Sequence, residues 1–312
     1  MDPTLFPTPK RRYLDVHGVE MFWAEEGEGR PLVLLHGLGD SHRTWEPVVR
    51  RLSKKYRVLM PDLPGHGLSA RPNATYSLAW HARMLANWME MLGLEEVDLV
   101  GHSFGGGVAQ WLLIDNSALV RRLALVSAGG LGHDVAVALR LASIPGFIER
   151  FGQPLMGLGT RIAMRVLGCP FDEEETAALA WMNSKPGTAA AFARTVKDVI
   201  NLRGQRRSIW DGAHLVPRLP PILLVWGERD PVIPIRHGAS LSSRVDGVSF
   251  ARFPECGHYP HRECPDAFAS AIEVFLADET TRAATLRHAP PKRPERTRLR
   301  RLVPDVLRSH RY

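Results

Sequence analysis

Cysteine is scarce in this chain of 312 residues, which contains only Cys169, Cys256 and Cys264. Their spacing matches neither a disulfide framework nor a metal site, so we expect three free thiols, a reducing compartment and no bound metal. Cys256 lies close to a histidine, but a buried, unreactive thiol is the more common state of such a residue. The fold must therefore depend on a hydrophobic core, and a chain of this length with 45% apolar residues can form a large one.

Long apolar runs are also missing. No stretch approaches the roughly 18 residues that a membrane-spanning helix needs. Residues 1–10 contain three prolines and no continuous apolar segment, so they resemble neither a signal peptide nor an anchor. These absences predict a soluble, cytoplasmic protein.

The body of the chain has little net charge. The whole chain carries +7, but the residues from Arg282 onward hold ten Lys or Arg against two Asp or Glu, which leaves −1 for residues 1–281. The body thus gives no electrostatic reason to expect nucleic acid or an acidic substrate. The basic tail, residues 279–312, is expected to be disordered. The alternative for residues 282–312 is a weak contact with an anionic surface.

What the chain does contain is a serine between small residues at the junction of a strand and a helix. The segment Gly101-His102-Ser103-Phe104-Gly105 follows the apolar run 96–100 and precedes the helix-like run 106–113. In this nucleophile elbow the serine occupies a strained turn, and glycine on either side lets strand and helix approach closely. The five-residue pattern alone is common in turns, so its flanks carry the prediction that Ser103 is a nucleophile.

Two residues that could activate this serine follow it in the chain. Asp230 comes after the predicted strand 221–226, and His258 comes after the predicted strand 248–253. A serine hydroxyl needs an imidazole to take its proton, and a carboxylate fixes the tautomer of that imidazole. We therefore predict His258 as the base and Asp230 as the acid, with His261 and Asp134 as the competing candidates.

An acceptor site for developing negative charge is predicted near the first parallel strand. Residues 31–35 are followed by His36-Gly37-Leu38-Gly39, and the backbone N–H groups of Leu38 and Phe104 are the predicted oxyanion donors. His36 is interpreted as a structural support for this loop. Asp62 and His66, in a neighbouring turn, are interpreted in the same way, because such side chains stabilise tight turns. His102 is given no chemical role.

These motifs, in this order, resemble those of the α/β-hydrolase family, in the branch with a serine nucleophile and a helical cap. The resemblance covers roughly residues 11–278 and includes the segments His36-Gly37, 61–69, 101–105, 227–230 and 257–258. It implies an α/β fold with a mostly parallel eight-stranded sheet and helices on both faces. It also implies hydrolysis through an acyl-enzyme without a cofactor.

The alternation of strands and helices divides the chain. Residues 1–10 form a lead-in, and residues 11–130 and 218–278 form the predicted core. Between them, residues 131–217 are helical and apolar with Gly and Pro breaks, which predicts a cap above Ser103. Most apolar cap residues are expected to pack between helices, and the remainder to line a pocket for an apolar group.

The leading functional prediction is a serine hydrolase of carboxylic esters or related acyl compounds, with a small apolar acyl substrate. Carbon–carbon bond hydrolases of ring-cleavage products are the alternative, although they typically carry tryptophan after the base, where this chain has Tyr259. Acyl transfer to an acceptor other than water also stays open. Epoxide hydrolases and haloalkane dehalogenases place aspartate at the position of Ser103, so this chain resembles them less well. A non-catalytic binding protein would not need Ser103, Asp230 and His258 together.

Overall fold

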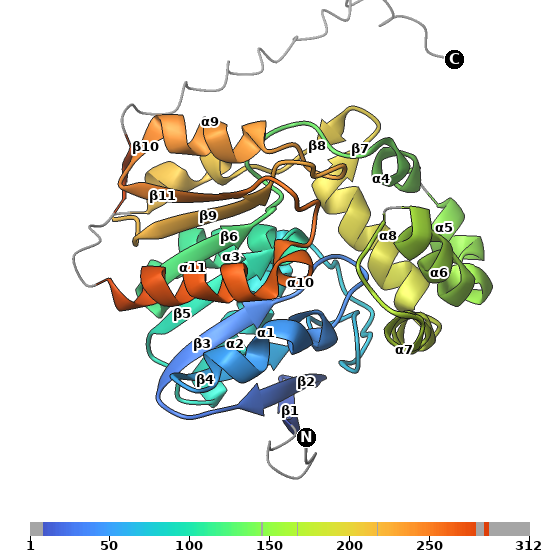
Figure 1. Cartoon of the computed structure of the whole chain (residues 1–312). Helices are drawn as coiled ribbons and strands as arrows, with labels where there is room; N and C mark the ends of the chain where they lie inside the picture. The colour runs from blue at the N-terminus through green and yellow to red at the C-terminus, as the bar shows by residue number, and fades with distance from the viewer. Residues whose placement is uncertain (1–8, 145, 167, 217, 279–283, 287–312) are drawn as a thin grey trace, which may run out of the picture.

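An eight-stranded sheet organises the chain, in a computed structural model that describes residues 9–144, 146–166, 168–216, 218–278 and 284–286. The strand order is β1-β2-β4-β3-β5-β6-β9-β11 (Figure 1). β1 and β2 are antiparallel to their neighbours, and the other strands pair in parallel. The prediction of a mostly parallel eight-stranded sheet is therefore confirmed. The strands are β1 (Lys10–Val16), β2 (Val19–Glu26), β3 (Arg30–Leu35), β4 (Tyr56–Pro61), β5 (Val97–His102), β6 (Val120–Val126), β9 (Ile222–Gly227) and β11 (Val248–Phe253).

Helices cover both faces of the sheet because the central strands are apolar on both sides. In β3, Val33 and Leu35 pack into the cluster on the face of α2, α3 and α9, whereas Leu32 and Leu34 pack into the cluster under α1 and α11. This alternation follows from the period of two residues in a strand. The covering helices are α1 (Glu46–Leu52), α2 (Leu78–Met91), α3 (Phe104–Asp115), α9 (Arg236–Arg244), α10 (Pro260–Glu263) and α11 (Pro265–Ala277).

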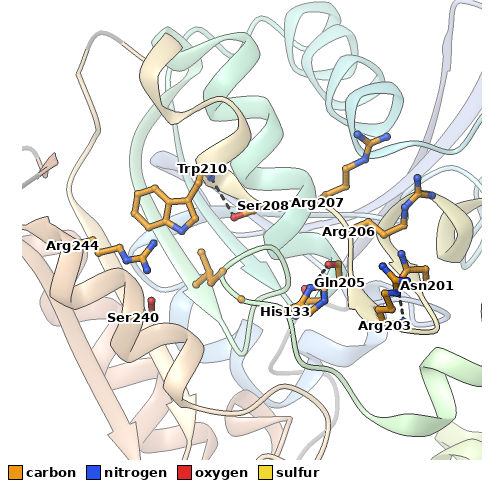
Figure 2. A pocket seen from close by; sticks show the side chains of 12 residues that line it. His133, Asn201, Arg203, Gln205, Arg206, Arg207, Ser208, Trp210, Ser240 and Arg244 are labelled. Carbon is orange, nitrogen blue, oxygen red and sulfur yellow. Dashed lines mark hydrogen bonds between the residues drawn. The ribbon is translucent and has the colours of Figure 1, made fainter. Parts of the chain in front are cut away.

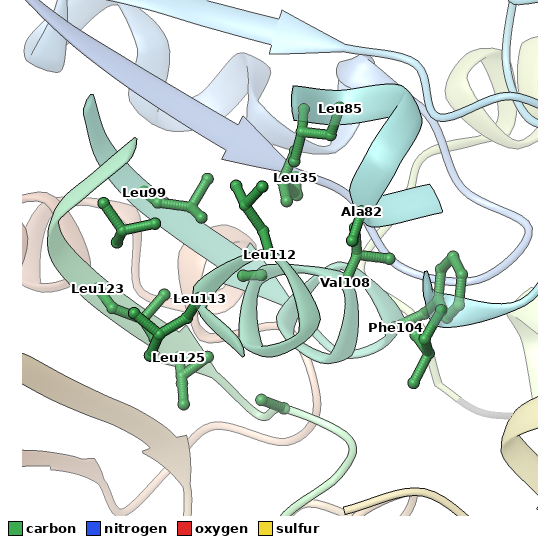
Figure 3. Close-up of a cluster of buried hydrophobic side chains, with 14 of the residues drawn as sticks. Leu35, Ala82, Leu85, Leu99, Phe104, Val108, Leu112, Leu113, Leu123 and Leu125 are labelled. Atoms are coloured by element: carbon green, nitrogen blue, oxygen red, sulfur yellow. The ribbon is translucent and has the colours of Figure 1, made fainter. Parts of the chain in front are cut away.

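The helix that follows the elbow is fixed by its surroundings. Figure 3 shows Val108 and Leu112 of α3 between side chains of the strands, such as Leu99, and side chains of α2, such as Leu85. Each of these four residues is fully buried. Because protein interiors are close-packed, α3 cannot shift without displacing the sheet or α2. The N-terminus of α3, where Ser103 lies, is thereby held in place.

The cap lies between β6 and β9 in the chain and stands at one end of the sheet (Figure 1). α8 lies between the sheet and the outer helices α5 and α6. The cap elements are α4 (Val137–Ala142), α5 (Phe147–Phe151), α6 (Met156–Val166), α7 (Glu173–Asn183), α8 (Thr188–Val199), β7 (Ile200–Asn201) and β8 (Gly204–Gln205). Short 3-10 turns are η2 (His42–Trp45), η3 (Ser117–Leu119), η4 (Gln153–Leu155), η5 (Ile209–Asp211) and η6 (Ala213–Leu215).

The small hairpin β7–β8 departs from the helical character that the sequence predicts for this segment. Its second strand begins directly after the turn at Gly204, whose φ of +132° favours glycine, and a Cβ there would collide with the carbonyl oxygen of His133. The next residue, Gln205, accepts a hydrogen bond from the Gly130 N–H (2.7 Å) and donates to the Asp134 carbonyl (3.0 Å). The hairpin is thus hydrogen-bonded to the segment where the cap begins.

The two ends of the chain lie mostly outside the described residues. The described part of the lead-in is Pro9 and Lys10, and Lys10 begins β1. The predicted tail, 279–312, is described only at residues 284–286, where β12 (Thr285–Leu286) pairs with β10 (Val245–Asp246). No sequence pattern predicts that pairing. Within the described residues, no helix has the length and apolar character needed to cross a membrane.

Candidate active site

Ser103 occupies a strained turn between β5 and α3. Its φ of +51° and ψ of −113° are unusual for a residue with a side chain. A Cβ on Gly105 would lie 2.5–2.6 Å from the carbonyl oxygens of His36 and Leu35, and one on Gly101 would lie 2.6 Å from the Gly105 oxygen. These approaches require glycine at both positions, as the elbow pattern predicts.

The structure brings Ser103, His258 and Asp230 together from three separate loops. Ser103 Oγ lies 3.0 Å from His258 Nε2, and His258 Nδ1 lies 2.9 Å from Asp230 Oδ2. The other Asp230 oxygen accepts the N–H groups of Val232 (2.8 Å) and Ile233 (2.9 Å). The Asp230 side chain is fully buried. A carboxylate held in this way favours the tautomer with the proton on Nδ1, which leaves Nε2 free to accept the serine proton.

The loop that carries His258 is fastened by two residues that sequence reasoning missed. Glu263 accepts the N–H groups of Gly257 (2.6 Å) and Tyr259 (2.9 Å), one on each side of His258. His102 Nε2 donates to the His258 carbonyl (2.9 Å). Burial lowers the pKa of His102 well below its usual range, so the ring is neutral. The sequence offers a local signal for Glu263, which is an acidic residue in the short helix that begins at Pro260. No local pattern indicates the contact made by His102.

The predicted oxyanion donors flank Ser103. Leu38 follows β3, and the loop there is so close that a Cβ on Gly37 would lie 3.4 Å from Ser103 Cβ. Phe104 is the first residue of α3, where backbone N–H groups have no partner within the helix. His36 holds the loop: its Nε2 accepts the Leu63 N–H (3.0 Å) and its Nδ1 donates to the Gly37 carbonyl (2.8 Å). The structural interpretation of His36 is therefore confirmed.

Asp62 and His66 also have structural partners. Asp62 accepts hydrogen bonds from the backbone and Nδ1 of His42 (2.6 and 3.0 Å) and from the Leu68 N–H (2.7 Å). Burial acts to raise the pKa of Asp62, but His42, His36 and the Leu68 N–H together outweigh it, so the pKa is lowered overall. The His66 ring contacts the Pro64 carbonyl (3.3 Å) and stacks on Phe104. These contacts confirm the turn-stabilising interpretation.

The competing base and acid lie in other surroundings. His261 is buried between Trp45, with ring centroids 4.4 Å apart, and Thr44, whose hydroxyl lies 3.0 Å from Nε2. Asp134 is half exposed and pairs with Arg236 (2.9 Å) and, more distantly, with His237 (3.5 Å). In the described part of the chain, neither residue is hydrogen-bonded to the side chain of His258 or Ser103.

The three cysteines are free, as the sequence predicts. Cys256 Sγ and Cys264 Sγ lie 2.7 Å apart. Burial raises the pKa of the Cys256 thiol, and it raises that of Cys169 to about 11. A thiol with a raised pKa is a poor nucleophile at neutral pH. Within the described residues, no group of three or more His, Cys, Asp and Glu side chains could hold a metal ion.

A cavity of about 350 Å³ opens above Ser103. Its lining combines the loop after β3 (Gly37, Leu38 and Gly39), Ser103 and Tyr259 with residues of the cap. Among the described residues that line it, none is Lys, Arg, Asp or Glu. The cap contributes Leu139, Ala142, Ile148, Gly152, Leu155, Met156, Gly159, Thr160, Ala163, Met164, Asn183, Thr188 and Phe192. A smaller cavity of about 60 Å³ continues from Ser103 and Phe104 to Gln205 and Arg207.

Three polar side chains tie the cap to the body around this cavity. Asn183 of α7 donates to the Gly39 carbonyl (2.7 Å), directly after the predicted oxyanion donor. Arg71 donates to Thr188 Oγ1 (2.8 Å) and to the Met182 carbonyl (3.0 Å). Arg262 pairs with Glu175 at 2.6 Å. No local sequence pattern indicates these long-range contacts.

A second cavity, of about 780 Å³, lies apart from Ser103 between the β7–β8 hairpin, η5 and α9 (Figure 2). Its lining contains four arginines. Arg207 pairs with Asp198 (2.6 Å), and Arg244 lies over the Trp210 ring (5.4 Å). In Figure 2, Arg206 and Arg207 lie on one side and Arg244 on the other, so the guanidinium groups do not converge on one point.

Comparisons with known proteins agree with this geometry. A family model described as "alpha/beta hydrolase fold" matches residues 30–263. An uncharacterized protein of Mycobacterium tuberculosis is 34% identical over 286 residues, which cover 88% of this chain and 83% of that protein. A 2-hydroxymuconate semialdehyde hydrolase of Pseudomonas sp. (strain CF600) is 30% identical, with 84% and 92% covered.

Among solved structures, a serine hydrolase involved in carbazole degradation superposes with a TM-score of 0.72 at 25% identity. The match covers 86% of this chain and 99% of that one. The sheet, the inserted cap and the family-model match over most of the chain lead to one conclusion. This chain belongs to the α/β-hydrolase fold family.

Proposed function

We propose that this protein is a serine hydrolase that cleaves a carboxylic ester, or a related acyl compound, through an acyl-enzyme. The proposal is supported by the continuous hydrogen bonding from Ser103 through His258 to Asp230. It is also supported by membership of a hydrolase family. The single observation that carries it is the pair of hydrogen bonds that join Ser103 to His258 and His258 to Asp230 beside an apolar cavity.

In the proposed first step, His258 Nε2 removes the Ser103 proton while Oγ attacks the substrate carbonyl carbon. The carbonyl oxygen becomes an oxyanion, which the N–H groups of Leu38 and Phe104 stabilise. When the intermediate collapses, His258 gives its proton to the leaving alcohol. In the second step His258 takes a proton from water, the hydroxide attacks the acyl-enzyme, and the acid leaves as Ser103 regains its proton.

The cavity favours a neutral, apolar acyl group. Its cap lining is mainly Leu, Ile, Met, Ala, Gly and Phe, and its polar members Thr160, Asn183 and Thr188 carry no charge. A substrate carboxylate in this cavity would lose its hydration without a cationic partner, which is costly. A volume of about 350 Å³ suits a small to medium group.

Carbon–carbon bond hydrolysis of a ring-cleavage product is the second candidate. The relative from Pseudomonas sp. acts, by its name, on 2-hydroxymuconate semialdehyde, a substrate that contains a carboxylate. In this chain Arg207 lines the small adjoining cavity and could meet such a group. Its guanidinium, however, already pairs with Asp198 at 2.6 Å, which weakens this alternative.

The test is a panel of p-nitrophenyl esters of increasing acyl length, assayed beside a ring-cleavage dienoate. We expect turnover of short to medium esters, little turnover of the dienoate, and loss of both in Ser103→Ala. Ser127→Ala, which changes a buried serine directly after β6, is the matched control and should keep activity. Turnover of the dienoate without the esters would favour the second candidate. Adding an alcohol acceptor distinguishes hydrolysis from acyl transfer.

A further inference from the structure

Two of the three cysteines lie against each other on the loop that carries His258. Cys256 Sγ and Cys264 Sγ are 2.7 Å apart. The sulfur atoms of a disulfide are about 2.05 Å apart, so forming the bond needs a movement of less than about 1 Å. Cys169 lies elsewhere, beside the Tyr259 hydroxyl. The thiols of Cys256 and Cys264 are therefore placed to react with each other.

The backbone holds both cysteines in this position. The Cys256 N–H donates to the Phe253 carbonyl at the end of β11 (3.2 Å), and the Cys256 carbonyl accepts the Arg229 N–H (3.0 Å). The Cys264 N–H donates to the Pro260 carbonyl (3.0 Å), at the junction of α10 and α11. Both side chains pack in the apolar cluster under α1 and α11. Because protein interiors are close-packed, the two sulfur atoms have little room to separate.

The two thiols differ in how an oxidant reaches them. Cys256 is fully buried, whereas Cys264 is half-buried at the start of α11. Burial raises the pKa of the Cys256 thiol, which makes it a poor first nucleophile. An oxidant that arrives from solvent therefore meets Cys264 first. Cys256 reacts in the second step, where its contact with Cys264 replaces a bimolecular encounter.

We propose that Cys256 and Cys264 are a site of reversible oxidation by a peroxide, and that their disulfide closes the loop that holds His258. In the first step the Cys264 thiolate attacks an oxygen of hydrogen peroxide, the O–O bond breaks, and a sulfenic acid and water form. In the second step the Cys256 thiolate attacks the Cys264 sulfur, the S–O bond breaks, and a second water leaves. Together the thiols lose two electrons and two protons, and the peroxide is reduced to water. A small dithiol reverses the reaction by exchange.

The disulfide would fasten the same loop as Glu263. The loop from Cys256 to Cys264 contains His258, and within it Glu263 accepts the N–H groups on either side of that histidine. A covalent link between the ends of the loop limits its motion without replacing either hydrogen bond. We therefore expect the oxidised chain to keep the geometry of its active site and to unfold at a higher temperature.

The test is oxidation of the folded full chain with a small excess of hydrogen peroxide, followed by alkylation in denaturant and digestion with trypsin. Trypsin cuts after Arg262, so it separates the two cysteines into the peptides 253–262 and 263–282. We expect a disulfide to join these peptides in more than about half of the chains, while Cys169 is alkylated. Treatment with dithiothreitol before alkylation should return all three cysteines to the alkylated form.

Matched variants identify the pair. Cys169→Ser should form the linked peptides as the original chain does, and Cys264→Ala should form none. Cys256→Ala should leave a sulfenic acid on Cys264, which dimedone captures. On oxidation, Tm of the original chain should rise by at least about 3 °C, because closing the loop restricts the unfolded chain. Tm of Cys264→Ala should not rise.

A second readout tests whether the disulfide acts on the base, and this readout rests on the proposed function. Glu263→Gln leaves one acceptor oxygen for two N–H groups, so we expect kcat on a p-nitrophenyl ester to fall by about tenfold. Oxidation of Glu263→Gln should raise its kcat by at least about threefold, whereas oxidation of the original chain should change kcat by less than about twofold. The rise should be absent when Glu263→Gln is combined with Cys264→Ala.

A folded chain that keeps both thiols alkylatable after oxidation would overturn the proposal, as would a disulfide that joins two copies of the chain through Cys264. Linked peptides with no rise in Tm, or with no rise in the kcat of Glu263→Gln, would overturn the closing of the His258 loop. Linked peptides and a higher Tm in a chain that turns over no ester would support the oxidation site and contradict the proposed function alone.

Discussion

The body and the cap meet at Ser103, but different contacts hold them. β3 buries apolar side chains on both faces of the sheet, whereas among the described residues α4 has no buried side chain and α6 buries only Thr160. Within the cap, α8 packs Val196 into the same core cluster as β3, whereas α7 is joined to the body by polar contacts with Arg71, Arg262 and the Gly39 carbonyl. Close packing fixes positions to fractions of an ångström, and a few hydrogen bonds do so less strictly. We infer that the body supplies the fixed geometry of the reaction, while the cap shapes the space for the substrate.

The largest expected effect comes from the acid in the body. Asp230→Asn keeps the size of the side chain but removes the charge that fixes the His258 tautomer. The corresponding change in a serine protease costs about 10⁴ in kcat, so we expect a loss of about 10³ to 10⁴ here. Asp134→Asn, at the rim of the cap, is the matched control and should change kcat by less than about twofold. Steady-state kinetics with a p-nitrophenyl ester measure both, and the reverse result would place the acid on Asp134.

Truncating a side chain should lower the free energy of unfolding much more in the body than on the exposed side of the cap. Leu35→Ala removes a fully buried side chain from β3 and should lower the free energy of unfolding by about 2–5 kcal/mol. Leu158→Ala removes a side chain that is 57% exposed on α6 and should change it by less than about 0.5 kcal/mol. Urea denaturation followed by circular dichroism measures both. Equal losses would mean that Leu158 is covered in solution.

Acid should destabilise the body through its buried histidines. Burial lowers the pKa of His81 to about 3, and both ring nitrogens lack a hydrogen-bond partner among the described residues. Between about pH 6.5 and pH 3 the unfolded chain binds a proton that the folded chain does not. The free energy of unfolding therefore decreases as the pH is lowered through this window. From pH 7 to pH 5, His81→Phe should lose about 1–2 kcal/mol less than the original chain, as urea denaturation at each pH would measure.

Other buried histidines also contribute to the loss of stability in acid. His66 and His102 also have lowered pKa values because they are buried, so the variant should reduce the acid sensitivity without removing it. Tyr76 and Phe104 pack against the His81 ring, and a phenylalanine fits among them. An unchanged slope of stability against pH would show that His81 is protonated in the folded state.

The smallest effect should follow removal of the chain after Leu286, which keeps β12. The motifs that form the site all precede this point, and the removed segment is charged and rich in proline. We expect kcat/KM on a small neutral ester to change by less than about twofold and Tm to stay the same. A marked fall in Tm would mean that residues beyond Leu286 pack on the body.

The elements of the body can be predicted from the sequence because each is indicated by a pattern within a short segment. Buried strands appear as continuous apolar runs, Ser77 is a typical capping residue at the start of α2, and the glycines around Ser103 predict the elbow. The predicted residues Ser103, Asp230 and His258 follow strands whose carboxyl ends meet at one edge of a parallel sheet. Their order along the chain is therefore enough to place them together.

The contacts of the cap cannot be predicted in the same way. Asn183 reaches Gly39 across 144 positions of sequence, and Arg262 reaches Glu175 across 87. The division of α6 into a cavity side and an exposed side also depends on what surrounds the helix, because both sides are apolar in sequence. The β7–β8 hairpin depends on a backbone contact between Gly204 and His133, for which no local pattern exists.

We propose above all that Ser103 is a nucleophile activated by His258. Intact-mass measurement after incubation with a fluorophosphonate probe tests it most directly, since the probe reacts with an activated serine. We expect one added label on the original chain, located on Ser103 by peptide mapping, no label on Ser103→Ala, and undiminished labelling of Ser127→Ala. A label that persists in Ser103→Ala, or an original chain that takes none while folded, would contradict it.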